Sequence, residues 1–123
     1  MKIIIDTHIF LWAIAAPDKL SAKQKQALET QSNRIYVSAV TVTELMIKSS
    51  LGKLTVDFDP VAIAMESGFE LLALSAEDAL ALQSMPFYHK DPFDRMLIAQ
   101  AINRNYKIMT NDEAFFNYAC HCV

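Results

Sequence analysis

The sequence predicts a three-layer α/β domain with a mainly parallel central sheet. Three consecutive isoleucines, Ile3 to Ile5, lack polar alternation and therefore indicate a strand that is buried on both faces. Helix-like and strand-like segments alternate along the whole chain, without a repeat or a linker. The chain has 123 residues, 53% of them hydrophobic, which is enough for one domain and too few for two. We therefore interpret residues 1–123 as a single domain.

Caps and prolines set the elements of the first half. We expect strands at 2–5 and 34–38, helices at 7–13, 22–31 and 40–51, and either a loop or a short extended piece at 54–58. Asp6 or Thr7 can cap the first helix, which must stop before Pro17. Ser21 is a suitable cap for the second helix, and Gly52 is placed to end the third.

The second half continues the alternation. We expect helices at 60–68, 76–83, 92–103 and 113–118, strands at 69–74 and 106–110, a loop at 85–90 and an edge strand at 120–123. Pro60 and Pro92 suit the first turn of a helix, and Ser75 and Asp91 supply caps.

Composition excludes several classes of protein. A net charge of −3 is not that of a generally basic nucleic-acid binder. No apolar run approaches the ~20 residues that a membrane span needs, and Asp6 interrupts the opening run too early for a signal peptide. Cys120 and Cys122 are too few for a zinc site and fit free thiols in a reducing cytosol, so we expect a cytoplasmic protein.

Four acidic residues are predicted to meet at one edge of the sheet. Asp6 and Asp112 each follow a predicted strand, while Glu44 and Asp94 lie in the first turn or turns of helices that follow strands. In a parallel α/β sheet these positions face the same edge, beyond the carboxyl ends of the strands. Asp6, Glu44, Asp94 and Asp112 can therefore converge.

Each acid except Asp6 also has a local explanation. Thr41 and Glu44 have the spacing of a capping box. Asp94 suits the dipole of its helix, and Asp112 could cap the helix that begins at residue 113. These alternatives stay open at the level of sequence.

Electrostatics favours a cation at this edge. Two carboxylates about 4 Å apart repel each other by about 4 kcal/mol at an effective dielectric constant of about 20. Oxygen ligands favour Mg²⁺ or Mn²⁺ over zinc. No serine or cysteine lies in a recognisable nucleophilic setting, so the pattern indicates phosphodiester hydrolysis assisted by one or two metal ions.

The chain resembles the PIN domain nucleases, and within them the VapC-type toxins of bacterial toxin–antitoxin pairs. The resemblance rests on ordered motifs: I-I-I-D-T-H-I-F-L-W-A from Ile3, S-A-V-T-V-T-E-L-M-I-K from Ser38, G-K-L from Gly52, H-K-D-P-F-D-R-M-L-I-A-Q-A from His89 and I-M-T-N-D from Ile108. It implies a metal-dependent endoribonuclease, using Mg²⁺ or Mn²⁺, whose catalytic and metal-binding acids match Asp6, Glu44, Asp94 and Asp112. It also implies a homodimer and a small antitoxin that places a basic side chain among the carboxylates.

Several residues outside the four acids are candidates for supporting roles or RNA contacts, and a few have no expected role. Thr7 and Thr110 match supporting hydroxyl positions of the family, and Arg95 is a candidate RNA contact. Lys48, Lys53 and Lys90 are also basic candidates, although ion pairs or solvated faces explain these lysines and Arg95 too. His8 and His89 flank the edge in structural or RNA-contacting roles. The resemblance transfers no role to Asp91, Glu113 or the Cys120-His121-Cys122 tail.

Two other functions compete with the nuclease. One is a PIN fold kept as a binding module without activity. The other is an Mg²⁺-dependent phosphate-handling signalling domain, of the receiver or haloacid dehalogenase type. A dehalogenase-type site requires D-x-D, whereas Asp6 is followed by Thr7 and His8, and a receiver requires a lysine where this chain has Thr110-Asn111-Asp112.

Overall fold

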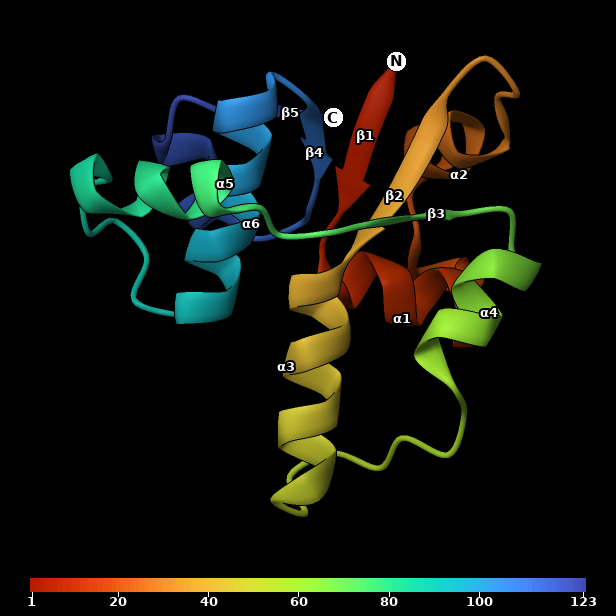
Figure 1. Ribbon diagram of the computed structural model, residues 1–123. Helices are drawn as coiled ribbons and strands as arrows, with labels where there is room; N and C mark the ends of the chain where they lie inside the picture. The colour runs from red at the N-terminus through yellow and green to blue at the C-terminus, as the bar shows by residue number, and fades with distance from the viewer.

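The computed structural model describes residues 1–123 and contains one five-stranded sheet (Figure 1). The strands are β1 (Lys2–Ile5), β2 (Arg34–Ser38), β3 (Glu70–Leu72), β4 (Lys107–Met109) and β5 (His121–Cys122). Their order is β3-β2-β1-β4-β5, and every pairing is parallel. The predicted α/β class is confirmed, and β1 is the central strand, as its three isoleucines indicated.

Helices cover both faces of the sheet (Figure 1). They are α1 (Thr7–Ala15), α2 (Ala22–Glu29), α3 (Ala39–Ser50), α4 (Pro60–Glu66), α5 (Ala76–Leu80) and α6 (Pro92–Arg104), with 3₁₀ helices η1 (Pro17–Lys19), η2 (Ala81–Ser84) and η3 (Glu113–Asn117). No helix combines the length and the apolar character needed to cross a bilayer.

The isoleucines of β1 divide between two cores because successive side chains of a strand point to opposite faces. Ile4 packs with Leu97 and Ile98 of α6, whereas Ile3 and Ile5 belong to the core that α1 covers. All three isoleucines are fully buried. Burial of this kind fixes the position of the residue that follows, Asp6, at the carboxyl edge.

Most helix starts follow their predicted caps. Asp6 Oδ1 accepts a hydrogen bond from the Ile9 amide at 2.8 Å, and Ser21 forms a capping box with Gln24. Ser38 caps α3 by accepting from the Val40 amide, so the capping-box interpretation of Thr41 and Glu44 is wrong. Because Ser38 caps α3, the Glu44 side chain is free for contacts outside its own helix.

Three segments differ from the prediction in detail. Residues 54–58 form neither helix nor strand, which settles the choice in favour of a loop. The expected helix at 76–83 divides into α5 and η2. The segment at 113–118 is the 3₁₀ helix η3, because only five residues lie between the Asp112 cap and buried Tyr118, and 3₁₀ geometry suits such short spans.

Candidate active site

The structure brings all four predicted acids to the carboxyl edge of the sheet. Asp6 follows β1, Glu44 lies on α3, Asp94 lies in the first turn of α6, and Asp112 follows β4. Asp94 lies close enough to Glu44 and Asp6 for their charges to affect its ionisation, and Asp112 affects that of Asp6 in the same way. Acids from four separated segments therefore share one electrostatic environment.

Keeping Asp94 and Asp6 ionised costs free energy. Burial raises the pKa of Asp94 to about 7, and the neighbouring carboxylates Asp91, Glu44 and Asp6 add to the rise while His89 opposes it. Burial also raises the pKa of Asp6, although hydrogen bonds from the Thr110 hydroxyl and the Ile9 amide oppose the change. A divalent cation would relieve both costs, so this oxygen-rich donor set fits Mg²⁺ or Mn²⁺.

Glu44 is held by two partners although it is almost fully buried. The Thr7 hydroxyl donates to Glu44 Oε1 at 2.7 Å, and Lys48, one turn further along α3, forms an ion pair with Oε2. Glu44 in turn raises the pKa of the Lys48 ammonium through that hydrogen bond. Lys48 is therefore engaged inside the site.

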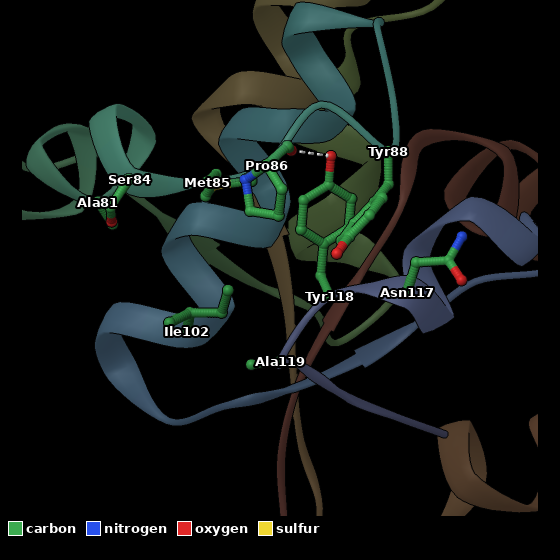
Figure 2. A pocket seen from close by; sticks show the side chains of 9 residues that line it. All are labelled: Ala81, Ser84, Met85, Pro86, Tyr88, Ile102, Asn117, Tyr118 and Ala119. Carbon is green, nitrogen blue, oxygen red and sulfur yellow. Dashed lines mark hydrogen bonds between the residues drawn. The ribbon is translucent and has the colours of Figure 1, made fainter.

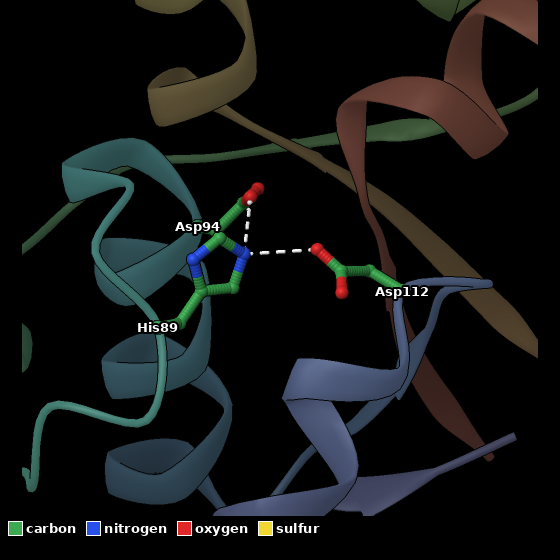
Figure 3. A group of neighbouring side chains, drawn as sticks. All are labelled: His89, Asp94 and Asp112. Atoms are coloured by element: carbon green, nitrogen blue, oxygen red, sulfur yellow. Dashed lines mark hydrogen bonds and ion pairs between the residues drawn. The ribbon is translucent and has the colours of Figure 1, made fainter.

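His89 links two of the acids through one nitrogen. Its Nε2 lies 2.9 Å from Oδ2 of Asp94 and 2.9 Å from Oδ2 of Asp112 (Figure 3). The Asp91 amide donates to His89 Nδ1 at 3.1 Å, so Nδ1 is an acceptor and the ring proton lies on Nε2. Ligand atoms of His89, Asp94 and Asp112 lie within 4.8 Å of one another. The Nε2–H group therefore lies between Asp94 and Asp112 and holds the two carboxylates in place.

The sequence predicted only that His89 lies near this edge, and not that its ring links Asp94 to Asp112. A signal exists in the spacing of His89, Asp91 and Asp94, since Asp91 caps α6 and its amide then faces back toward residue 89. Asp91 Oδ1 accepts from the amides of Phe93 and Asp94 at 2.9 and 3.0 Å, which confirms its predicted capping role.

Arg95, one of the candidate RNA contacts, holds the loop that carries His89. Its guanidinium donates to Pro86 O at 2.9 Å, to Met85 O at 3.3 Å and to the Tyr118 hydroxyl at 3.2 Å, and the residue is only 7% exposed. Tyr118 donates to Pro86 O at 2.7 Å (Figure 2) and accepts from the His89 amide at 2.9 Å. Burial and these carbonyl and hydroxyl partners give the guanidinium a structural role in holding the loop.

Two cavities differ in their relation to the acids. A cavity of about 380 Å³ lies beside Pro86, Tyr88 and Tyr118 and touches none of the acids (Figure 2). A smaller cavity of about 230 Å³ is lined by Asp6, His8, Trp12, Asn111 and Asp112. The smaller cavity is the one that opens onto the candidate site.

The remaining candidates have simple environments. Thr110 Oγ1 accepts from the Asp112 amide at 3.0 Å, and Asp112 Oδ1 accepts from the Ala114 amide, so Asp112 is both a cap and a member of the acidic group. Glu113, Lys53 and Lys90 are exposed or nearly so. Cys120 and Cys122 are free thiols 3.9 Å apart, and burial raises the pKa of both, that of Cys122 to about 12.

Fold and site together define a parallel α/β domain with an acidic centre at the carboxyl ends of its strands. Residues 3–119 match the PIN domain, and the chain belongs to this family. That match spans every acid of the centre.

Known proteins similar to this chain include a VapC ribonuclease and VapBC complexes. Ribonuclease VapC22 of Mycobacterium tuberculosis is 28% identical over 120 residues, covering 89% of this chain and 86% of the relative. Among solved structures, VapBC2 from Rickettsia felis, bound to a DNA fragment from its promoter, has a TM-score of 0.77 at 18% identity, covering 100% of this chain and 98% of that one. DNA-bound VapBC from Salmonella typhimurium has a TM-score of 0.70 at 18% identity, and the match covers 100% of this chain and 97% of that one. These structures show the fold that the chain shares.

Proposed function

We propose that this protein is a metal-dependent endoribonuclease and the toxin of a toxin–antitoxin pair. The observation that carries the proposal is the convergence of Asp6, Glu44, Asp94 and Asp112 from four separated segments. Membership of the PIN domain family and the likeness to a ribonuclease of the VapC type support it.

The four acids would hold one or two Mg²⁺ or Mn²⁺ ions. A bound ion supplies activation of water and neutralises charge on the phosphate and the leaving oxygen. The protein's own side chains keep the acids in place. The Thr7 hydroxyl donates a hydrogen bond to Glu44, and the His89 ring holds Asp94 and Asp112. The Thr110 hydroxyl accepts a hydrogen bond from the Asp112 amide. Buried groups around the site exclude water from the inner carboxylates, of which Asp6 and Glu44 are each 4% exposed.

The proposed partners are RNA, a small antitoxin and a second copy of this chain, acting in the cytoplasm. Solved relatives are VapBC complexes, which supports an antitoxin partner. Co-purification with the small protein encoded next to this one, followed by light scattering, tests both associations. A chain that stays monomeric and binds no such protein contradicts this part of the proposal.

Nuclease activity is tested on single-stranded and structured RNA with Mg²⁺ or Mn²⁺, and with EDTA as the metal-free reference. Asp6→Asn and Asp94→Asn each remove a negative ligand without changing size, so we expect cleavage to fall by about 100-fold or more. Asp57→Asn, at an exposed carboxylate outside the site, is the matched control and keeps the wild-type rate. Cleavage that survives both site substitutions undiminished rejects the mechanism.

A PIN fold that binds partners without cleaving RNA is the second candidate. It is favoured by one feature: Lys48 and His89 already contact three of the four acids, so the site is partly compensated without a metal. Titration calorimetry with Mn²⁺ separates the two functions. Absence of Mn²⁺ binding, with a partner protein still bound, supports the binding module.

A further inference from the structure

The cavity of about 230 Å³ beside the acids has an unusual lining for an acidic site. It is lined by the two acids Asp6 and Asp112 and by His8, Trp12 and Asn111. A ligand in this cavity would therefore contact both proposed catalytic acids and an aromatic surface.

Trp12 supplies that aromatic surface. It is the chain's single tryptophan, it lies on α1 one turn after His8, and it is half-buried. The His8 ring meets it edge to face, with centroids 6.4 Å apart and an interplanar angle of 70°. Lys19 Nζ lies over the indole ring, 5.9 Å from its centre, so a cation covers one face of the ring and the other face is the one that a base would use.

Asn111 presents a hydrogen-bond donor to the same cavity. Gln24 belongs to the capping box of α2, in which its Oε1 accepts from the Ser21 amide at 3.0 Å. Its Nε2 is therefore the group that faces Asn111, and it donates to Asn111 Oδ1 at 2.8 Å. With its oxygen fixed in this way, Asn111 keeps Nδ2 as a free donor at the cavity.

We propose that this cavity binds a nucleobase of the RNA next to the scissile phosphate, with Trp12 as the stacking surface and Asn111 as a donor to a carbonyl or ring nitrogen of the base. The proposal rests on the ribonuclease function and names a binding site within it. A base is favoured over a phosphate because the lining contains no lysine or arginine for an anion, whereas an aromatic side chain stacks on any base.

The single tryptophan makes the cavity directly observable. The Asp94→Asn variant, in which we expect cleavage to be impaired, is titrated with short single-stranded oligoadenylate and oligouridylate in the presence of Mg²⁺. Indole emission reports stacking at Trp12, and the anisotropy of a dye on the oligonucleotide reports total binding. We expect saturable quenching with the same midpoint as the anisotropy change.

Wild-type cleavage kinetics supply the second readout. Trp12→Leu is expected to raise KM by about tenfold with kcat little changed, because stacking contributes to binding of the base. Trp12→Phe retains a stacking ring and restores most of the affinity. Phe116→Leu, at an exposed aromatic residue that does not line the cavity, is the matched control. Circular dichroism verifies that each variant is folded. The quenching experiment keeps the native Trp12, so its result does not depend on the folding of a Trp12 variant.

The outcomes separate this proposal from the nuclease itself. RNA cleavage with the KM unchanged in Trp12→Leu, or oligonucleotide binding that leaves indole emission unaltered, overturns the base site and leaves the nuclease standing. Quenching by oligonucleotides without cleavage by the wild type supports the base site and rejects the nuclease. Absence of binding to any oligonucleotide overturns both.

Discussion

At the scale of single residues, one hydrogen-bond donor organises two acids. The Asp91 amide fixes the proton of His89 on Nε2, and that proton is shared between Asp94 and Asp112. A donor of this kind holds like charges together at a distance that a metal ion can span. The role depends on an N–H group at the Nε2 position and not on an imidazole ring as such.

His89→Gln is therefore expected to retain function where His89→Ala does not. A glutamine amide places an N–H group near the Nε2 position, whereas alanine leaves the carboxylates unsupported. We expect His89→Ala to weaken Mn²⁺ binding by about 10- to 100-fold, measured by calorimetry, and His89→Gln to stay within a few-fold of the wild type. His121→Ala, at an exposed histidine of β5, is the control. Equal losses in both His89 variants would show instead that Nε2 ligates the metal.

At the scale of elements, a buried carboxylate ties α5 to α6. Asp78 is fully buried and accepts from the Arg104 guanidinium at 3.0 Å, from the Asn103 amide at 2.8 Å and from the Ser75 backbone amide at 2.9 Å. Burial alone would disfavour its charged form, but these hydrogen bonds outweigh burial and lower the pKa of Asp78 to about 2. The ionised carboxylate thus stabilises the folded protein.

Asp78→Asn is expected to lower the free energy of unfolding by about 2 kcal/mol at pH 7, from a pKa difference of nearly two units. A depressed pKa stabilises the fold above the unfolded value of 3.8, and this stabilisation is lost as pH falls toward 2. Urea unfolding at several pH values should therefore show the wild-type advantage intact above pH 4 and shrinking below it. Glu77→Gln, at the exposed neighbouring carboxylate, should show little change. If the difference in the free energy of unfolding between the wild type and Asp78→Asn does not change with pH, the effect comes from packing and not from the charge of Asp78.

The elements themselves were predictable where local chemistry sets them. Ile3 to Ile5 identified the central strand, and the caps Asp6, Ser21 and Asp91 identified helix starts, because each acts within a few residues of its own position. The strand order β3-β2-β1-β4-β5 and the bond between the Asp91 amide and His89 depend on packing between distant segments or on loop geometry. Neither leaves a periodic pattern in the sequence.

The contacts that Arg95 makes were not predictable for the same reason. A basic residue next to Asp94 fits a phosphate contact as long as only its neighbours along the chain are considered. Its actual partners, the carbonyls of Met85 and Pro86, belong to an irregular loop whose path no sequence pattern describes. Convergence of the four acids was predictable because parallel topology alone directs strand ends and the following helix starts to one edge.

At the scale of the whole molecule, the acidic centre should reduce the stability of the metal-free protein. Four segments are folded against one another so that their carboxylates meet, and the pKa of Asp94, raised to about 7 by burial and by its neighbours, measures the cost of keeping it charged. Sites arranged for function commonly reduce the stability of a protein, and removing a buried, poorly compensated charge from such a site restores stability.

Asp94→Asn is accordingly expected to raise the melting temperature in EDTA at pH 7.5, although the same substitution removes activity. A gain of about 1 kcal/mol corresponds to roughly 5 °C in a domain of this size. Mn²⁺ should then raise the melting temperature of the wild type and narrow the gap, because a cation that binds only the folded state stabilises it by mass action. Asp57→Asn should show neither effect, since that carboxylate is exposed and lies outside the site. If Asp94→Asn melts below the wild type in EDTA and Mn²⁺ shifts neither protein, the carboxylates are held by protein groups such as Lys48 and His89, and the acidic centre is a structural feature of the fold without a metal.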